Sequence, residues 1–303
     1  MCEEVKLFRR RTHCPMCHKE CGDARELFSV AQMDMEMRVL CCPVCGLAFK
    51  EYVPTAEMFN RIYTKDYAPY QESSDGGEMI NRVHRMGGAT RKTHLDYGCG
   101  NGSLVRTALS LGWESYGSDP YLPDGVVPSG RFFKNSPATT MPVPTAPFDV
   151  ISLWAVVEHL DHPLDTFTWL ATQLKKNGRM IFNVPNGDSL IARKHGRDWR
   201  IAQYLDHTVF FTRKTVKWLA CTMNVRVMHC DSCGTPWPFG RGKEYVSKKE
   251  TVKTHGAVGN GMGTLAAAQL VGRNRHLRGC LRWVVNTFRL GDHLYVVYEK
   301  DAG

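Results

Sequence analysis

The sequence predicts an α/β protein with a mostly parallel sheet, preceded by a small cysteine-rich unit. Three observations support this class. A glycine-rich turn, "HLDYGCGNGSL" at 94–104, lies between a predicted strand and a predicted helix. Strand and helix patterns alternate from there to residue 184, and two C-x-x-C motifs lie near the N-terminus. Alternating strands and helices are typical of parallel sheets with right-handed crossovers.

Length and composition fit one large domain and a small one. The 303 residues are 43% hydrophobic and 23% charged, as in an ordinary globular protein. No stretch is apolar enough to span a membrane, and the N-terminus lacks the apolar core of a signal peptide, so we expect a cytoplasmic protein. In a reducing compartment the twelve cysteines are metal ligands or buried apolar residues.

The chain divides by pattern into three parts. We expect a ribbon at 1–50, a linker or lid at 51–90, and the α/β domain at 91–303, with insertions at 186–212 and 233–290. In the linker, Thr55 is the expected N-cap of a short helix, "TAEMFNRIY". Tyr63, Tyr67 and Tyr70 either pack on the neighbouring domain or close over a ligand site.

Two cysteine pairs predict the ribbon. Cys14 and Cys17 form one C-x-x-C motif, and Cys42 and Cys45 form the other. Such knuckles at the ends of a hairpin place four thiolates tetrahedrally, which suits Zn(II) in a closed structural site. Each knuckle has a proline after its first cysteine, and Gly46 follows the second pair as a residue able to adopt positive φ. Alternatively, Cys21 or Cys41 replaces a neighbour, or these thiols are simply buried.

The glycine turn and its flanking carboxylates predict a nucleoside site. "KTHLDYG" reads as a strand and "GSLVRTALSLG" as a helix, so the glycines let the backbone between them approach a ligand. Asp96 precedes the turn, where a carboxylate disfavours pyrophosphate but suits a cationic amino-acid group. This favours S-adenosylmethionine, whose methionine moiety carries an ammonium. Asp119 ends the next strand, "WESYGSDP", where it can accept hydrogen bonds from both ribose hydroxyls.

Two further strands continue the pattern. "FDVISLWAVVEHL" at 148–160 is a strand leading into a turn. The segment after it gives a helix, a Lys-Asn-Gly stop and a strand at 179–184. Ligands of such sheets bind at the carboxyl ends of the strands, where the glycine turn, Asp119 and residues 154–159 fall.

With these motifs in place, the chain resembles the class I S-adenosylmethionine-dependent methyltransferases, specifically bacterial-type members with an N-terminal four-cysteine ribbon. The motifs that carry the resemblance run in the expected order from residue 14 to 300: "CPMC", "CPVCGLAF", "HLDYGCGNGSL", "YGSDP", "FDVISLWAVVEHLDHPLDT", "LKKNGRMIFNVPN", "DHTVFFTRKTVKWL" and "GDHLYVVYEK". They are specific for the superfamily and leave the substrate open.

The resemblance implies a Rossmann-like seven-stranded sheet whose last strand is antiparallel, with strands six and seven at 225–230 and 293–300. It also implies cofactor roles. Asp96, Gly98, Gly100 and Gly102 line the methionine part, Asp119 binds the ribose, and Trp154 contacts the cofactor from the other side. One departure is the run "KNSPATTMP", which lacks the acid that family members often place near the adenine. Asn135, Ser136 or a backbone amide is then the expected substitute.

The candidate acceptor residues follow strand four and the first insertion. Glu158 and His159 lie beside the expected methyl group, and His207 lies in "DHTVFFT". Each is a candidate base for an oxygen or carbon acceptor, or else a structural group. The insertion also carries five basic residues that bind an anionic acceptor or form a solvated face: Arg193, Lys194, His195, Arg197 and Arg200.

Three functions are consistent with these patterns. The first is methyl transfer to a small-molecule acceptor, such as a sugar, a lipid-linked compound or a secondary metabolite. The second is RNA methylation, supported by the net charge of +9, the ribbon and the run Arg9–Arg11. Against RNA methylation, the segment after strand four is not the Asn-Pro-Pro-Tyr type of motif. The third is a non-catalytic subunit of an assembly, with 233–290 as a protein-partner surface.

Overall fold

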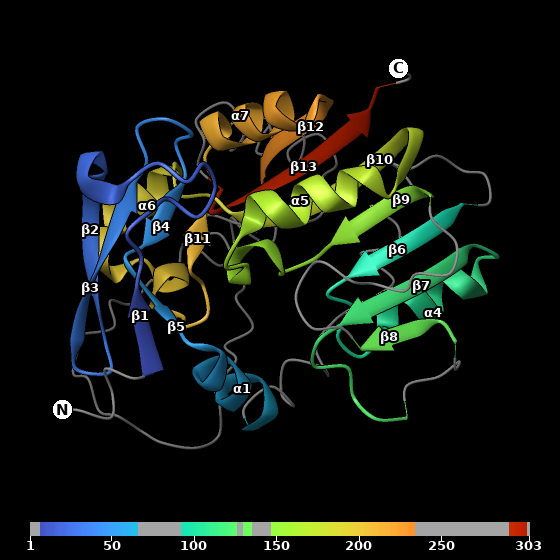
Figure 1. Ribbon diagram of the computed structural model, residues 1–303, viewed down its shortest axis with the longest axis horizontal. Coiled ribbons are helices and arrows are strands. Elements are labelled where there is room, and N and C mark those ends of the chain that lie inside the picture. The colour runs from blue at the N-terminus through green and yellow to red at the C-terminus, as the bar shows by residue number, and fades with distance from the viewer. Residues whose placement is uncertain (1–6, 66–91, 126–129, 135–146, 234–290, 302–303) are drawn as a thin grey trace, which may run out of the picture.

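The computed structural model describes residues 7–65, 92–125, 130–134, 147–233 and 291–301. Two sheets dominate these residues, a large one at one end of the molecule and a small one at the other (Figure 1). Almost all of the segment 233–290, interpreted as a partner surface, lies outside the described residues, which end at 233 and resume at 291. Tyr67, Tyr70 and most of the run expected near the adenine also lie outside them.

The large sheet has seven strands in the order β12-β13-β10-β9-β6-β7-β8. Of these, only β13 runs against its neighbours, since it pairs antiparallel with both β10 and β12. The predicted fold class, including the reversed last strand, is therefore confirmed. The strand bounds are β6 Thr93–Tyr97, β7 Glu114–Asp119, β8 Phe132–Lys134, β9 Phe148–Leu153, β10 Leu174–Pro185, β12 Val225–Cys233 and β13 His293–Lys300.

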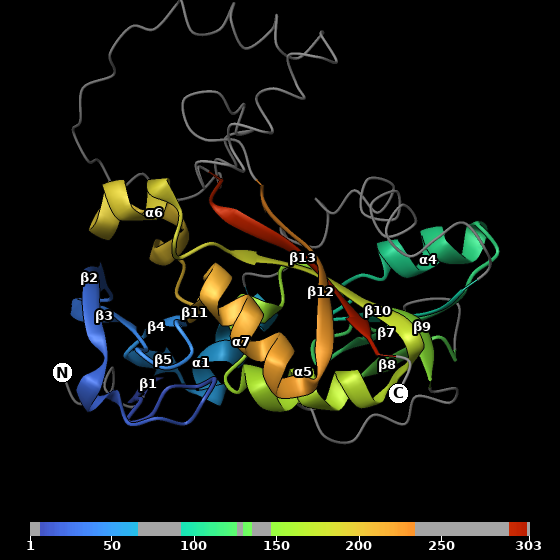
Figure 2. The ribbon, with the colours of Figure 1, turned by 90° about the horizontal axis from the view of Figure 1, so that it is seen from above.

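Helices cover both faces of this sheet. Figure 2 shows α4 (Ser103–Ser110) on one face, and α5 (Pro163–Thr172) and α7 (Arg213–Met223) on the other. The strands between them are buried on both sides, which explains nearly continuous apolar runs such as "LYVVY" in β13. Residue Thr212 caps α7 by accepting a hydrogen bond from the backbone N–H of Thr215 at 3.1 Å.

One strand differs from its sequence prediction. The strand expected at 179–184 begins earlier, at Leu174, directly after α5 ends at Thr172. The Lys-Asn-Gly run forms an irregularity inside β10, because the pairing register with β9 shifts between Leu174 and Arg179. Asn177 has a φ of 60°, and a Cβ at Gly178 would lie 2.9 Å from two carbonyl oxygens. The glycine therefore makes a tight bulge instead of separating two elements.

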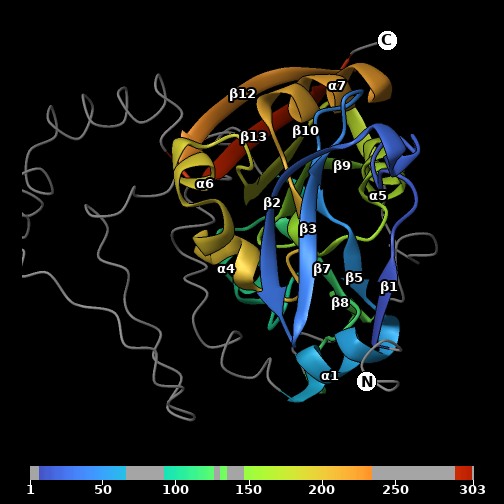
Figure 3. The same cartoon turned by 90° about the vertical axis from the view of Figure 1, so that its left-hand side faces the viewer.

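The ribbon segment contributes three of the four strands of the small sheet. Its hairpin consists of β2 (Arg25–Gln32) and β3 (Met35–Cys41), which are seen face-on in Figure 3. The sheet order is β11-β4-β3-β2, with β4 at Ala48–Lys50 and β11 at Val209–Phe210. A second pair, β1 (Phe8–Arg10) and β5 (Tyr52–Pro54), leads into α1 (Ala56–Lys65), whose Met58 N–H lies 3.5 Å from Thr55 Oγ1.

The ribbon and the α/β domain share a core. Strand β11 comes from the first insertion, yet it completes the ribbon sheet by pairing with β4. Cys14, Cys45 and Phe49 belong to the same buried cluster as Phe211 of the insertion and Leu219 of α7. Burial across this junction removes apolar surface from water on both sides. The three-part division of the chain stays a prediction.

The orientation of the strands places the functional edge. The arrowheads of β6, β7 and β9 in Figure 1 point toward the ribbon, so their carboxyl ends face the small sheet. The insertion between β10 and α7, which includes α6 (Leu190–His195), lies on that side. Within the described residues, no helix is long and apolar enough to cross a membrane.

Candidate functional site

The glycine turn is tightly enclosed. The backbone N–H groups of Gly98 and Cys99 both donate to the Ser118 carbonyl, at 2.7 and 3.0 Å. Gly98 and Gly102 have φ values of 77° and 78°. A Cβ on Gly98 would lie 2.2 Å from Val156 Cγ2, and one on Gly102 would lie 2.3 Å from a ring carbon of Phe132. Only glycine fits at these positions, because the side chains of Val156 and Phe132 fill the space that a Cβ would occupy.

Asp96 is a buried carboxylate at the end of β6. Its side chain accepts a hydrogen bond of 2.7 Å from Ser152 Oγ on β9. Because that hydroxyl has one proton to give, it must accept from His94 Nε2, 2.8 Å away. Burial raises the pKa of Asp96 to about 7, with the Ser152 hydrogen bond opposing the rise and the charge of Asp119 adding to it. A cation beside Asp96 would therefore restore its ionised form.

Asp119 is the second carboxylate of this edge. Its Oδ2 accepts from the Gly100 N–H at 2.9 Å, and its Oδ1 accepts from the Tyr121 N–H at 2.7 Å. Burial raises its pKa, while the two backbone hydrogen bonds oppose that effect. Each oxygen keeps a lone pair beyond these bonds, so the carboxylate can also accept from a diol. The glycine turn and Asp119 are thus fixed to each other directly.

Trp154 follows β9 and stacks on Tyr295 of β13, with ring centroids 5.8 Å apart. Its indole Nε1 is buried without a hydrogen-bond partner among the described residues. A buried N–H that lacks a partner costs free energy unless a ligand or water accepts from it. Whether Trp154 contacts a cofactor stays a prediction.

The three predicted acceptor residues come together. A carboxylate oxygen of Glu158 and one ring nitrogen from each of His159 and His207 lie within 4.8 Å of one another. Glu158 and His159 are held in a short 3₁₀ turn after β9, Val157–His159. The Thr208 N–H donates to the Glu158 carbonyl at 2.8 Å, which fixes the insertion against this turn. Their roles as candidate bases stay predictions.

Burial shifts the pKa values of two groups in this cluster. Burial raises the pKa of Glu158, although the charge of His159 opposes it. Burial also lowers the pKa of His207 well below its ordinary value, and the charges of His159 and Lys50 lower it further. Both effects disfavour the charged form of His207.

Four residues of this region were not singled out as site residues by the sequence patterns. Asp206 accepts from His159 Nδ1 through its carbonyl at 3.0 Å, and from Tyr63 Oη at 3.1 Å. Lys50 is fully buried, donates to Gln32 and to the Tyr204 carbonyl, and has its pKa lowered to about 7 by burial. At His293, burial disfavours the charge, but Asp292 outweighs it and raises the pKa.

Local sequence gave only partial signals for these groups. Asp206 and His293 lie inside the motifs "DHTVFFT" and "GDHLYVVYEK", and Tyr63 was noted as one of three tyrosines. Tyr63 stacks on Tyr121 with ring centroids 4.6 Å apart and lies edge-on to His159 at 6.0 Å. It therefore connects the end of β7 with the histidine cluster.

The four predicted ribbon cysteines also converge. Their sulfur atoms all lie within 4.8 Å of one another, with Cys14 and Cys45 at 3.6 Å and Cys17 and Cys42 at 3.4 Å. The knuckles match, because the N–H groups of His18 and Gly46 each donate to the first cysteine's carbonyl at 3.0 Å. Cys21 and Cys41 are not part of the cluster. Four sulfur donors so arranged suit a tetrahedral zinc ion.

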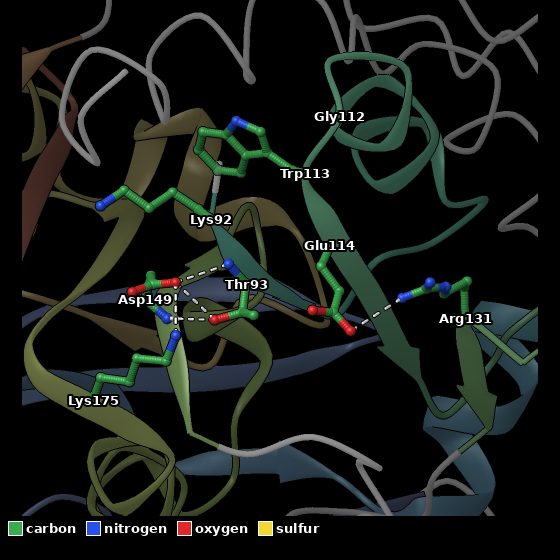
Figure 4. A pocket seen from close by; sticks show the side chains of 8 residues that line it. All are labelled: Lys92, Thr93, Gly112, Trp113, Glu114, Arg131, Asp149 and Lys175. Carbon is green, nitrogen blue, oxygen red and sulfur yellow. Dashed lines mark hydrogen bonds and ion pairs between the residues drawn. The ribbon is translucent and has the colours of Figure 1, made fainter. Parts of the chain in front are cut away.

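A hollow of about 500 Å³ lies at the opposite edge, where β6, β7 and β9 begin. Four of its charged groups form two ion pairs (Figure 4). Lys175 Nζ donates to Asp149 at 2.9 Å, and Arg131 faces Glu114 at 3.8 Å. None of the predicted site residues lines it. The candidate site is therefore the ribbon-facing edge.

Several solved structures have a similar fold. A SAM-dependent methyltransferase from Archaeoglobus fulgidus is 14% identical, covering 80% of this chain and 99% of its own, with a TM-score of 0.45. A possible histamine N-methyltransferase from Thermotoga maritima is 14% identical, covering 80% and 98%, with a TM-score of 0.47. A search among curated proteins gives no match.

The family profile described as "Methyltransferase domain" matches residues 70–229, more than half of the chain. This range contains the glycine turn, both buried carboxylates and the Glu158, His159 and His207 cluster. The resemblance to class I S-adenosylmethionine-dependent methyltransferases drawn from the motifs is thereby confirmed. The protein belongs to the methyltransferase-domain family.

Proposed function

We propose that the protein transfers the methyl group of S-adenosylmethionine to a small-molecule acceptor, of the sugar, lipid-linked or secondary-metabolite type. The observation that carries this proposal is the pairing of two features at one sheet edge. A glycine turn that follows the buried Asp96 and donates to the buried Asp119 lies beside a separate cluster of one carboxyl and two imidazole groups.

The residues of the turn fit the cofactor. The space that a Cβ would fill at Gly98 and Gly102 is closed by Val156 and Phe132, so a ligand approaches the backbone from the remaining side. Asp96 gains a counterion from an ammonium group, and Asp119 has acceptor capacity for ribose hydroxyls. Trp154 offers a buried indole N–H.

When bound, the sulfonium supplies an activated methyl group. The chain must then position the acceptor in line with that methyl, exclude water and favour an ionised acceptor. Val156, which contacts the turn, is followed two residues later by Glu158. The loop after β9 thus joins the cofactor side to the acceptor side, and Tyr63 lies against both through Tyr121 and His159.

The ion pairs of the N-terminal arginines favour a small acceptor over RNA. Arg9 and Arg11 both pair with Asp161, and Arg10 pairs with Glu51. Arg11 is 5% exposed and also donates to the Thr208 carbonyl at 3.2 Å. This run therefore fastens β1 to the loops around the cluster, and Asp161 and Glu51 partly neutralise the charge of these three arginines.

We also propose that Cys14, Cys17, Cys42 and Cys45 hold a structural Zn(II) ion. Three of the four cysteines are buried in the core shared with the α/β domain, and Cys17 is partly buried against it. With four protein ligands the coordination is complete, so such an ion organises the fold and takes no part in methyl transfer.

The test is calorimetric titration of the zinc-loaded protein with S-adenosylmethionine and S-adenosylhomocysteine. We expect micromolar binding that is lost in Asp119→Ala and kept in Asp124→Ala, a matched change at an exposed aspartate. Binding would justify acceptor screening with anionic sugars first and RNA second. A folded, zinc-loaded protein that binds neither compound would refute the proposal and favour a non-catalytic role.

A further inference from the structure

We propose that Glu158, His159 and His207 bind a divalent transition-metal ion on the acceptor side of the methyltransferase site. This inference deepens the proposed function, because it assigns a ligand to the same cluster. Two imidazoles and one carboxylate are a donor set that suits Zn, Fe, Ni, Co and Mn. The site is distinct from the ribbon, whose donors are all sulfur.

The first argument is that the three side chains are close but not bonded to one another. Their ligand atoms lie within 4.8 Å, yet no hydrogen bond joins any two of these described side chains. Metal bonds of ~2.0–2.2 Å place neighbouring ligand atoms ~3.0–3.5 Å apart. The observed spacing leaves room for an ion after a small inward movement of the side chains.

The second argument is that the cluster holds polar atoms without partners. Glu158 is 2% exposed, and its Oε2 has no hydrogen-bond partner within the described part of the chain. His207 Nδ1 is also buried without a hydrogen-bond partner among the described residues. Leaving a buried acceptor unsatisfied costs ~1–3 kcal/mol. A cation in the cluster would satisfy the carboxylate and accept the imidazole lone pairs.

The third argument is that one of the two histidines, His159, is oriented by a hydrogen bond on the far side of its ring. His159 Nδ1 donates to the Asp206 carbonyl at 3.0 Å and lies 3.3 Å from the Asp206 carboxylate, so in the neutral ring Nε2 has the lone pair. Metal-binding histidines typically donate their second N–H to a carbonyl or carboxylate in this way.

Other charges face the cluster. Lys50 and His293 are the neighbouring cationic groups, and Asp206 adds a carboxylate beside Glu158. Three protein ligands leave coordination positions open for an acceptor or water. Because a bound cation lowers the pKa of a coordinated hydroxyl, the site predicts an acceptor that presents a hydroxyl or enol oxygen to the metal.

The test uses Co(II) as the probe on the full-length, zinc-loaded protein. We expect one further equivalent of Co(II) to bind, with the weak ligand-field absorption of nitrogen and oxygen donors. Cobalt that replaced zinc in the ribbon would instead give intense thiolate charge-transfer bands. Calorimetry and absorption together should show that Glu158→Gln and His207→Ala each weaken Co(II) binding at least tenfold.

Two measurements keep the result interpretable. His162→Ala, at a histidine whose side chain is 59% exposed in the same segment, should leave Co(II) binding unchanged. Binding of S-adenosylhomocysteine reports whether the variants remain folded and tests the proposed function separately. The metal site is overturned if the wild-type protein binds no Co(II) beyond the ribbon, or if neither cluster variant weakens it. Methyl transfer would stand in that case if the cofactor still binds.

Discussion

Replacing Asp96 with asparagine should stabilise the cofactor-free protein at alkaline pH and weaken cofactor binding at least tenfold. Burial raises the pKa of Asp96 from 3.8 to about 7. At 1.36 kcal/mol per pKa unit, the ionised carboxylate lowers the stability of the folded protein by about 4 kcal/mol at high pH. Asparagine keeps an oxygen that can accept from Ser152 Oγ but carries no charge.

The direction of the pH dependence follows from linkage. An acid whose pKa is raised on folding binds its proton more tightly in the folded state, so stability is lost as pH rises from 3.8 through 7. Between pH 5.5 and pH 8 the wild-type protein should lose about 2 kcal/mol from this group relative to Asp96→Asn. Any constant cost of the altered hydrogen bond cancels in that comparison.

Urea unfolding at the two pH values, with excess zinc, measures the difference. Asp124→Asn, at an exposed aspartate, serves as the matched control and should follow the wild type. Titration with S-adenosylhomocysteine should show at least tenfold weaker binding to Asp96→Asn. A variant whose stability depends on pH as the wild type does would refute the buried, perturbed carboxylate. Normal cofactor affinity would remove Asp96 from the cofactor site.

Three further changes test the turn, the ribbon and the N-terminal anchor. Gly98→Ala should lower the free energy of unfolding by ~1–3 kcal/mol and weaken S-adenosylhomocysteine binding in calorimetry, because its Cβ would lie 2.2 Å from Val156. Adding Val156→Ala should restore part of the stability and part of the affinity. Undiminished binding in the single variant would contradict the clash. Cys45→Ser should prevent zinc binding and lower the stability of the whole chain by more than ~3 kcal/mol. Thermal unfolding should show one transition, since the ribbon shares the main core. Two separate transitions would show that the units unfold independently. Arg11→Met should destabilise by ~2–3 kcal/mol in urea, less than a fully buried pair because its carboxylate partner is 40% exposed. Arg10→Met, at a side chain that is 61% exposed, should cost under ~1 kcal/mol, and equal losses would be inconsistent with burial as the cause.

The sequence by itself determined the local chemistry. Positive φ at Gly46 was predicted from its place after a cysteine knuckle, and the glycine turn was predicted between a strand and a helix, where Gly98 and Gly102 also have positive φ. The two C-x-x-C motifs likewise identified the four clustered thiols. The apolar runs predicted β6, β7, β9 and most of β10, because the strands of a parallel sheet are buried on both faces. The family resemblance, not the pattern, implied β12 and β13.

Only the tertiary structure decided which distant segments meet. Strand β11 joins the ribbon sheet, Arg11 contacts Asp161, and His207 lies beside Glu158 and His159. Local periodicity reports which face of an element is buried, but not which other element covers it. The burial of Lys50 and the raised pKa of Asp96 depend on that covering, because desolvation comes from every segment packed around a group and not from its neighbours in sequence.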